Sequence, residues 1–475
     1  MYNFNTIFVA AIPFLIDDAR FNCKNAQGVF VECSKEVACA NRQNSVIDMD
    51  RSYDNFIIAL HLECDDGFKV SLMAMFAFGA NWAGSFIFNV LGDKYGRLKI
   101  SKIGFLLAAS LYLLYLPPIT YGLVLGYMLM FGFLNSYFLQ SYILGVEFTS
   151  SENRDFYTIV AQSFDGLMGT FTVIVFSLTR NYKIFMISGF AMGFIIMILM
   201  FLFVPESPRY YVATNQNKKA VGVYKYLAKL HPDQKVKETI RLLEEKVNSG
   251  ISLQDDDADE IPFKQQMAYF VKTKKRVAIA IIVSLCWFVN CLQNYGLNLE
   301  LGQLQGDILI NSAISNVTGF FACFMSYPVL LYAKRKPAQL GGFTLTMVAS
   351  AAYVYVDGHV ALQYFLLFLI KFGIALTFIL IYCFTTELYP TQIRGLAFGL
   401  ANTFGRLATI ISSLMVGVPA SIFMWMNVGQ SLLIILFTFV LPETKGLQLE
   451  DKITDDKVID SEESTKETPE VEHER

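Results

Sequence analysis

Three charged side chains, Asp165, Lys371 and Arg406, lie inside segments of the sequence that are otherwise apolar. A charge at the centre of a membrane-spanning helix costs about 2.5–3.5 kcal/mol on insertion scales, so each is expected to face a cavity or a partner. A carboxylate could bind an ammonium group, and the two cations could bind a carboxylate or sulfonate, the guanidinium as a bidentate fork. These residues therefore predict a binding site for a small organic ion.

The two cations are expected at a similar depth. Arg406 lies 12 residues past Arg394, which is about 18 Å of helix, and Lys371 lies 16 residues before Glu387. Two cations at one depth repel each other unless an anion lies between them, and the substrate could supply that anion. In an alternative interpretation, Arg406 pairs with Asp165 across an interface and has only a structural role.

Aromatic residues could complete such a site. Trp287 and Tyr295 lie eight residues apart, near the same face of a helix, and Phe372 and Phe378 lie in another apolar segment. Their rings could stack on flat organic ions and attract cationic groups. We expect Trp287 and Tyr295 to join the three charges as substrate-binding residues.

A second group of charges lies where apolar segments end, and it could form a gate: Asp93, Arg97, Glu147, Arg154, Glu387 and Arg394. In two places a glutamate is followed by an arginine seven residues later. Charge-assisted hydrogen bonds between such groups could close an inner gate and break when it opens. The alternative is a set of solvated charges worth under about 1 kcal/mol each.

The sequence predicts no catalytic site, metal site or cofactor. The four histidines, His61, His231, His359 and His473, are scattered along the chain, so no metal cluster is expected. The phosphate-binding motif of ATP-driven pumps is absent from the sequence. We therefore do not expect an enzyme.

The composition is that of a membrane protein. The 475 residues are 54% hydrophobic and 17% charged, with a mean hydropathy of +0.43, whereas soluble domains contain about 25% charged residues. This excludes a soluble enzyme, a nucleic-acid-binding module and a disordered scaffold. The net charge of −3 indicates little about partners.

Segments of about 20 apolar residues can cross a bilayer as helices. Eleven segments qualify: 70–90, 102–117, 119–144, 157–179, 184–204, 277–299, 308–331, 341–357, 360–385, 396–416 and 421–441. Phe4–Ile16 is shorter, and we interpret it as a first helix whose beginning is missing or shortened. The prediction is an all-α membrane protein with twelve transmembrane helices, the first of them truncated.

Lysine and arginine are concentrated in one set of the short loops, which the positive-inside rule places in the cytoplasm together with both termini. The loop 17–69 is then extracellular. It carries Cys23, Cys33, Cys39 and Cys64, which predict two disulfides with three alternative connectivities. Cysteines in the apolar segments are expected to be packing residues.

The expected domains are an N-terminal transmembrane bundle, a cytoplasmic loop with helices near 218–229 and 235–247, a C-terminal bundle, and a charged tail: residues 1–204, 205–276, 277–441 and 442–475. The two bundles look like a repeat, because Glu387–Arg394 follows Glu147–Arg154 at an offset of 240. Parallel six-helix repeats are typical of transporters whose substrate site lies between the halves.

At family level the chain resembles the major facilitator superfamily and, within it, the organic cation, anion and zwitterion transporters of solute carrier family 22. The resemblance rests on four sequence stretches and on the large Cys-bearing loop: Gly92–Arg97, Pro205–Arg209, Lys371–Arg394 and Leu441–Gly446. It departs from the family pattern at Asn89, Leu98 and Tyr127, and the loop between helices 8 and 9 keeps only Lys334-Arg335-Lys336.

The resemblance implies the major facilitator fold and a transporter that works by alternating access. Cation-selective members have an aspartate where this chain has Arg406, whereas anion and carnitine-type members have an arginine. It therefore implies small organic anions or zwitterions as substrates. The alternatives are an organic cation transporter, which Asp165 favours, and a non-transporting receptor of the same fold. The implied location is the plasma membrane, and a coupling ion or counter-substrate is left open.

Overall fold

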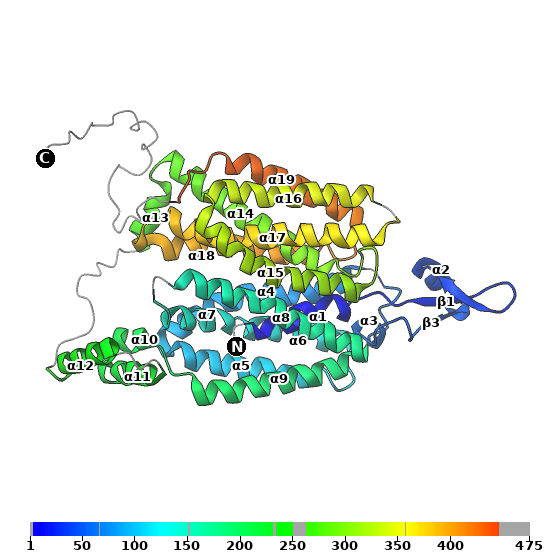
Figure 1. Cartoon of the computed structure of the whole chain (residues 1–475). Coiled ribbons are helices and arrows are strands. Elements are labelled where there is room, and N and C mark those ends of the chain that lie inside the picture. The colour runs from blue at the N-terminus through cyan, green and yellow to red at the C-terminus, as the bar shows by residue number, and fades with distance from the viewer. Residues whose placement is uncertain are drawn as a thin grey trace.

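The computed structural model describes residues 3–65, 67–150, 153–230, 234–249, 263–356 and 358–445. Its helices form two bundles that lie side by side (Figure 1). The first bundle contains α1 (Phe4–Leu15), α4 (Gly67–Tyr95), α5 (Arg97–Leu114), α6 (Tyr121–Asn135), α7 (Tyr137–Glu147), α8 (Arg154–Thr179) and α9 (Tyr182–Phe203). The second contains α14 (Lys274–Leu299), α15 (Ile308–Tyr332), α16 (Arg335–Tyr355), α17 (Val360–Leu388), α18 (Thr391–Ser413) and α19 (Ala420–Thr438).

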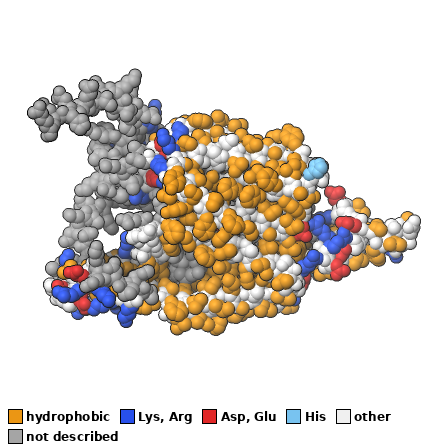
Figure 2. Space-filling view, in the orientation of Figure 1, with side chains coloured by type: hydrophobic (Ala, Val, Ile, Leu, Met, Phe, Trp, Pro, Cys, Tyr) orange, Lys and Arg blue, Asp and Glu red, His pale blue; other side chains and the backbone are white. Residues whose placement is uncertain are grey.

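The apolar sequence explains these helices. Among the described residues, eight helices are long and apolar enough to cross a membrane, with α6 and α7 counted as one. Figure 2 shows a broad apolar surface over the bundles and charged side chains gathered beyond its two ends. The remaining bundle helices, α1, α5, α16 and α18, are shorter or contain more polar residues. The predicted all-α membrane fold of two helical bundles is confirmed, including the short first helix.

A disulfide-linked lobe extends from one end of the bundles (Figure 1). It contains a three-stranded antiparallel sheet of β1 (Phe21–Lys24), β2 (Phe30–Cys33) and β3 (Ser45–Ile47) in the order β2-β1-β3. The short helices α2 (Lys35–Ala40) and α3 (Phe56–Ala59) and the 3₁₀ turn Arg42–Asn44 complete the lobe. We call this the disulfide end of the molecule.

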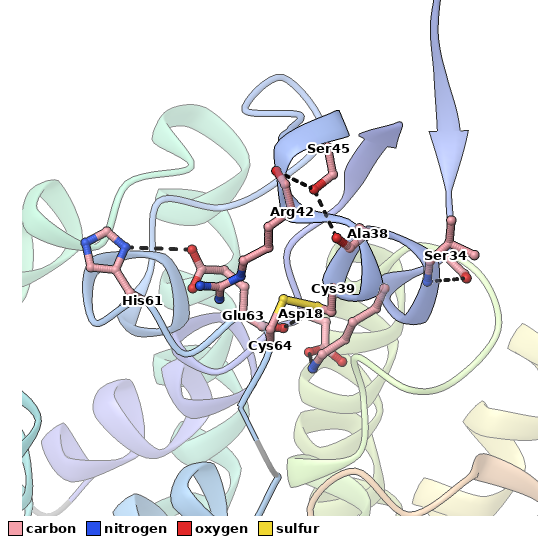
Figure 3. The surroundings of a disulfide bond; sticks show 11 residues. Asp18, Ser34, Ala38, Cys39, Arg42, Ser45, His61, Glu63 and Cys64 are labelled. Carbon is pink, nitrogen blue, oxygen red and sulfur yellow. Dashed lines mark hydrogen bonds and ion pairs between the residues drawn. A yellow bond between two sulfur atoms is a disulfide. The ribbon is translucent and has the colours of Figure 1, made fainter. Parts of the chain in front are cut away.

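Both predicted disulfides form, and the structure selects one connectivity. Cys23 pairs with Cys33 and joins β1 to β2. Cys39 pairs with Cys64, which ties α2 to the segment that leads into α4 (Figure 3). Beside this bond, the Ser45 hydroxyl donates to the backbone oxygen of Ala38. The lobe is therefore attached to the first bundle through covalent as well as packing contacts.

The opposite end carries the charged loops, and we call it the motif end. The helices α10 (Pro208–Ala213), α11 (Asn217–Leu230), α12 (Gln234–Asn248) and α13 (Phe263–Val271) lie there (Figure 1). Helices α11 and α12 coincide with the two loop helices expected from the sequence. Among the described residues, the most extensive helix contacts between the bundles are those of α8 with α15 and of α4 with α18, and α1 also packs against α14.

Candidate functional site

A cavity of about 190 Å³ lies between the two bundles. Nine helices contribute side chains to it: α1, α4, α6, α7 and α8 from the first bundle, and α14, α15, α17 and α18 from the second. Four of the five predicted substrate-binding residues line this cavity: Asp165, Tyr295, Lys371 and Arg406. The fold thus brings together charges that are up to 241 residues apart (406 − 165) in the sequence.

Asp165 enters the cavity from α8 and is held by α1. Its Oδ1 atom accepts a hydrogen bond of 2.6 Å from the Thr6 hydroxyl. The position of α1 against α8 is fixed further along, where the Thr172 hydroxyl donates to the Ile7 carbonyl oxygen at 2.8 Å. Lys371 lies close enough for its charge to act on the Asp165 carboxylate. Asp165 therefore faces a cation of the opposite bundle.

Lys371 is almost completely buried on α17, with 7% of its surface exposed. Its ammonium donates to the amide oxygens of two asparagines on α14, at 2.8 Å to Asn294 and 3.3 Å to Asn298. The Asn298 oxygen also accepts from Ser315 of α15, at 3.1 Å. The neutral amide oxygens hold the ammonium group in place without neutralising it, so its positive charge remains available to a ligand.

Arg406 reaches the cavity from α18 and contacts aromatic side chains. Its guanidinium carbon lies 5.1 Å from the centre of the Phe138 ring, a cation–π contact that crosses from one bundle to the other. The Tyr295 hydroxyl is in hydrogen-bonding contact with Arg406, and the Tyr295 ring packs edge-on against Phe78. The aromatic residues thus orient a planar cation at the centre of the protein.

Trp287, the fifth predicted substrate-binding residue, is not among the residues that line the cavity. It is 1% exposed, and its indole N–H donates to the Thr385 hydroxyl at 2.9 Å. Its ring packs against Tyr382, with 4.5 Å between the centroids, and Tyr382 lines the cavity in its place. Phe378 also lines the cavity, whereas Phe372 stacks against Phe368 outside it.

Neutral amides form a large part of the lining, and sequence reasoning missed most of them. The lining includes Asn5, Asn81, Asn135, Gln162, Asn294, Asn298, Asn316 and Asn402. A search for amides inside apolar segments would have found them, because an amide facing lipid without a hydrogen-bond partner is costly. They give the cavity both donors and acceptors for a small polar ligand.

At the motif end, the first bundle contains an ion-pair network. The guanidinium of Arg97, at the start of α5, forms an ion pair with Glu147, at the end of α7. It also contacts Asp93 at 3.2 Å. In the second bundle, Arg335 begins α16 and makes three hydrogen bonds of 2.7–3.1 Å to the Glu387 carboxylate at the end of α17. Both ion pairs join helices of the same bundle.

Glu387 forms its ion pair with an arginine other than the one that follows it seven residues later. Its ion pair is with Arg335 rather than with Arg394, which lies partly buried in the first turn of α18. Arg154 begins α8, but its side chain lies outside the described residues. The sequence named Arg335 only as part of the loop motif between helices 8 and 9 and not as a gating residue, although its distance of 238 residues from Arg97 (335 − 97) matches the repeat.

Two further glutamates that the sequence analysis did not single out act at the same end. Glu206 accepts backbone N–H groups of Leu98 at 2.9 Å and Lys99 at 3.3 Å, at the start of α5. Glu443 accepts those of Arg335 at 2.9 Å and Lys336 at 3.2 Å, at the start of α16. A carboxylate at a helix N-terminus satisfies unpaired N–H groups and complements the helix dipole.

Solved structures match this architecture. The inward-open xylose transporter XylE from E. coli has a TM-score of 0.60 and 18% identity, with 95% of each chain covered. A D-xylose-proton symporter has a TM-score of 0.58 and 15% identity, covering 94% of this chain and 98% of that one. At these identities the likeness shows the fold.

Sequence relatives agree with the fold. The organic cation/carnitine transporter 2 of Homo sapiens is 24% identical over 83% of this chain and 70% of its own length. Organic cation transporter 1 of Caenorhabditis elegans is 23% identical over 86% and 70%. The β-alanine transporter of Drosophila melanogaster is 23% identical over 84% and 66%.

The sequence profile of the Major Facilitator Superfamily matches residues 46–413, most of the chain. The profile covers helices of both bundles and the cavity residues Asp165, Lys371 and Arg406. This multi-pass membrane chain therefore belongs to the major facilitator superfamily of transporters and is a distant relative of solute carrier family 22.

Proposed function

We propose that this protein transports small zwitterions, which carry both an ammonium group and a carboxylate, by alternating access of its two bundles. The observation that carries the proposal is the charge arrangement in the cavity, where Asp165 of one bundle faces Lys371 of the other and Arg406 of that second bundle lines the same cavity. Asp165 would bind the ammonium group, and the cations would bind the carboxylate. Tyr295, Phe378 and other lining aromatics would contact the alkylated ammonium.

The names of the relatives narrow the choice that the sequence left open. They include organic cation/carnitine, organic cation and β-alanine transporters, so a substrate with a positive charge is better supported than a simple organic anion. A simple organic cation is the second candidate, supported by the same names and by Asp165. A zwitterion also makes use of Arg406 and Lys371, and we favour it for that reason.

Uptake into cells or vesicles tests the proposal. Labelled carnitine, β-alanine, tetraethylammonium and an aromatic carboxylate should be compared in parallel. We expect carnitine or β-alanine to enter fastest, and Arg406→Asp to reduce their uptake at least tenfold at equal surface expression. Uptake of tetraethylammonium alone would favour the cation candidate, and uptake of none would favour a non-transporting receptor.

The charged residues of the motif end are proposed to form the inner gate: Asp93, Arg97, Glu147, Arg154, Glu387 and Arg394. The gate residues of each bundle would move together with that bundle during alternating access, because the observed ion pairs join helices within one bundle. We also propose a plasma-membrane location with both termini in the cytoplasm, since the disulfide lobe requires an oxidising compartment. Imposed ion gradients would reveal whether a coupling ion or a counter-substrate drives uptake.

A further inference from the structure

The two opposite charges in the cavity come from different bundles and face each other without direct contact. Asp165 belongs to α8 and Lys371 to α17, and each lies close enough for its charge to act on the other. The described residues form no direct ion pair between these two side chains. A gap in the cavity therefore separates two complementary charges.

Each charge is held by neutral groups of its own bundle. Thr6 donates to the Asp165 carboxylate, while Asn294 and Asn298 accept two N–H bonds of the Lys371 ammonium. An ammonium has three donors, and Lys371 makes no third hydrogen bond within the described part of the chain. One N–H of Lys371 thus remains for a ligand, and Lys371 stays fixed while that ligand binds.

We propose that Lys371 sets the charge class of the substrate by acting as the counter-charge of Asp165. A monocation that binds Asp165 has to share this carboxylate with Lys371, and it places a like charge beside the lysine. A zwitterion brings its own carboxylate for Lys371, so both charges of the cavity stay balanced. Lys371 would therefore reject simple cations, a specificity that rests on the proposed function.

The test exploits a pair of ligands that differ only in the carboxylate. Carnitine is a zwitterion, and its methyl ester is a monocation of nearly the same shape. In the natural protein, the ester should inhibit carnitine uptake at least tenfold more weakly than unlabelled carnitine does. In Lys371→Gln, which keeps amide donors for Asn294 and Asn298, the two ligands should inhibit within about threefold of each other.

Arg406→Gln is the matched control, because it removes the same charge from a different part of the cavity. It should weaken carnitine binding without improving inhibition by the ester. If both variants accept the ester equally well, only the net charge of the cavity matters and the proposal is wrong. Asp165→Asn combined with Lys371→Gln should abolish the stronger inhibition by the ester that Lys371→Gln alone produces, since the ester then has no carboxylate to bind.

The outcomes separate the two proposals. Absence of carnitine and β-alanine uptake by the natural protein would overturn the proposed function. Normal carnitine uptake with equal inhibition by carnitine and its ester would overturn only the role of Lys371, and this measurement needs no variant. A Lys371→Arg variant, which keeps the charge, should preserve the discrimination at least in part.

Discussion

In the first bundle, Arg97 at the start of α5 pairs with Glu147 at the end of α7. In the second bundle, Arg335 at the start of α16 pairs with Glu387 at the end of α17. In both bundles a further glutamate accepts the first N–H groups of the third helix. The cavity does not follow this repeat, because the acid Asp165 lies in the first bundle and both cations lie in the second. The two halves therefore share the ion pairs and helix-capping glutamates of the motif end, and they differ in the charges of the cavity, where a ligand would bind.

The largest expected effect comes from breaking the repeated ion pair in either half. Removing one partner of a buried ion pair costs about 3–5 kcal/mol, because the remaining charge stays buried. The Glu147 side chain is only 8% exposed, and that of Arg335 10%. Arg97→Ala and Arg335→Ala should therefore each reduce transport at least tenfold at equal surface expression, measured by initial uptake rates.

Exposed lysines beside each arginine provide the controls. Lys99→Ala and Lys334→Ala change a charge in the same turns but remove no ion pair that the described residues form, so uptake should stay within about twofold of the natural protein. If one arginine variant transports normally while the other does not, the halves are not mechanically equivalent. Adding Glu147→Gln to Arg97→Ala should restore part of the activity, because it removes the unpaired charge.

The positions of charges and helices were predictable to different degrees. Apolar segment length predicted the helices, since a bilayer core fixes the number of residues that a helix needs. The burial cost of a charge identified Asp165, Lys371 and Arg406. Helical spacing alone does not decide whether Trp287 reaches the cavity, because its ring packs against Tyr382 of another helix, and Tyr382 lines the cavity. Which residues reach a cavity depends on contacts between helices, and these contacts cannot be inferred from a single sequence.

The repeat also relates residues outside the predicted gate. Arg335 lies at the expected offset from Arg97, but its surrounding sequence differs from the stretch around Arg97, so the local motif does not indicate its role. The pairing of the four lobe cysteines does not follow from the sequence for a different reason. Each connectivity closes loops of reasonable length. The register of β1 on β2 pairs Cys33 with Phe21 and Cys23 with Val31, which makes Cys23 and Cys33 diagonal neighbours with Cα atoms 5.6 Å apart.

Within the described residues, the disulfide lobe has no counterpart in the second half, and its two disulfides should contribute unequally. Their cysteines are 10 and 25 residues apart. In the chain-entropy model these loops correspond to about 2.7 and about 3.5 kcal/mol. Cys39→Ser with Cys64→Ser should therefore destabilise the lobe more than Cys23→Ser with Cys33→Ser, measured by proteolysis over a denaturant series. The reverse order would show that strain or packing outweighs loop length.

The smallest expected effect concerns the disulfide end, where each half buries a carboxyl group just after its first helix. Asp17 follows α1, and Glu300 follows α14. Asp17 is 6% exposed and lies against Gly302 of the opposite half, and Glu300 is fully buried. Burial raises the pKa of Asp17 to about 7 and that of Glu300 to about 8. Arg20 lowers the pKa of Asp17 and partly offsets this effect, whereas Asp18 and Asp307 raise it further.

These raised pKa values predict that acid stabilises the closed disulfide end. When this end opens and water reaches the carboxyls, their pKa values return toward 3.8 and 4.5. The closed arrangement is then favoured most below about pH 4, and that advantage is lost as the pH rises toward 7 to 8. The thiols of Cys291 and Cys323 line the cavity, so an impermeant thiol reagent added at the disulfide end should label them when that end opens. Labelling should increase a few-fold between pH 5 and pH 8, after correction for the reagent's own pH dependence with a free thiol. Asp17→Asn and Glu300→Gln should each flatten this increase, and an unchanged slope in the double variant would contradict the shared role of the two carboxyls.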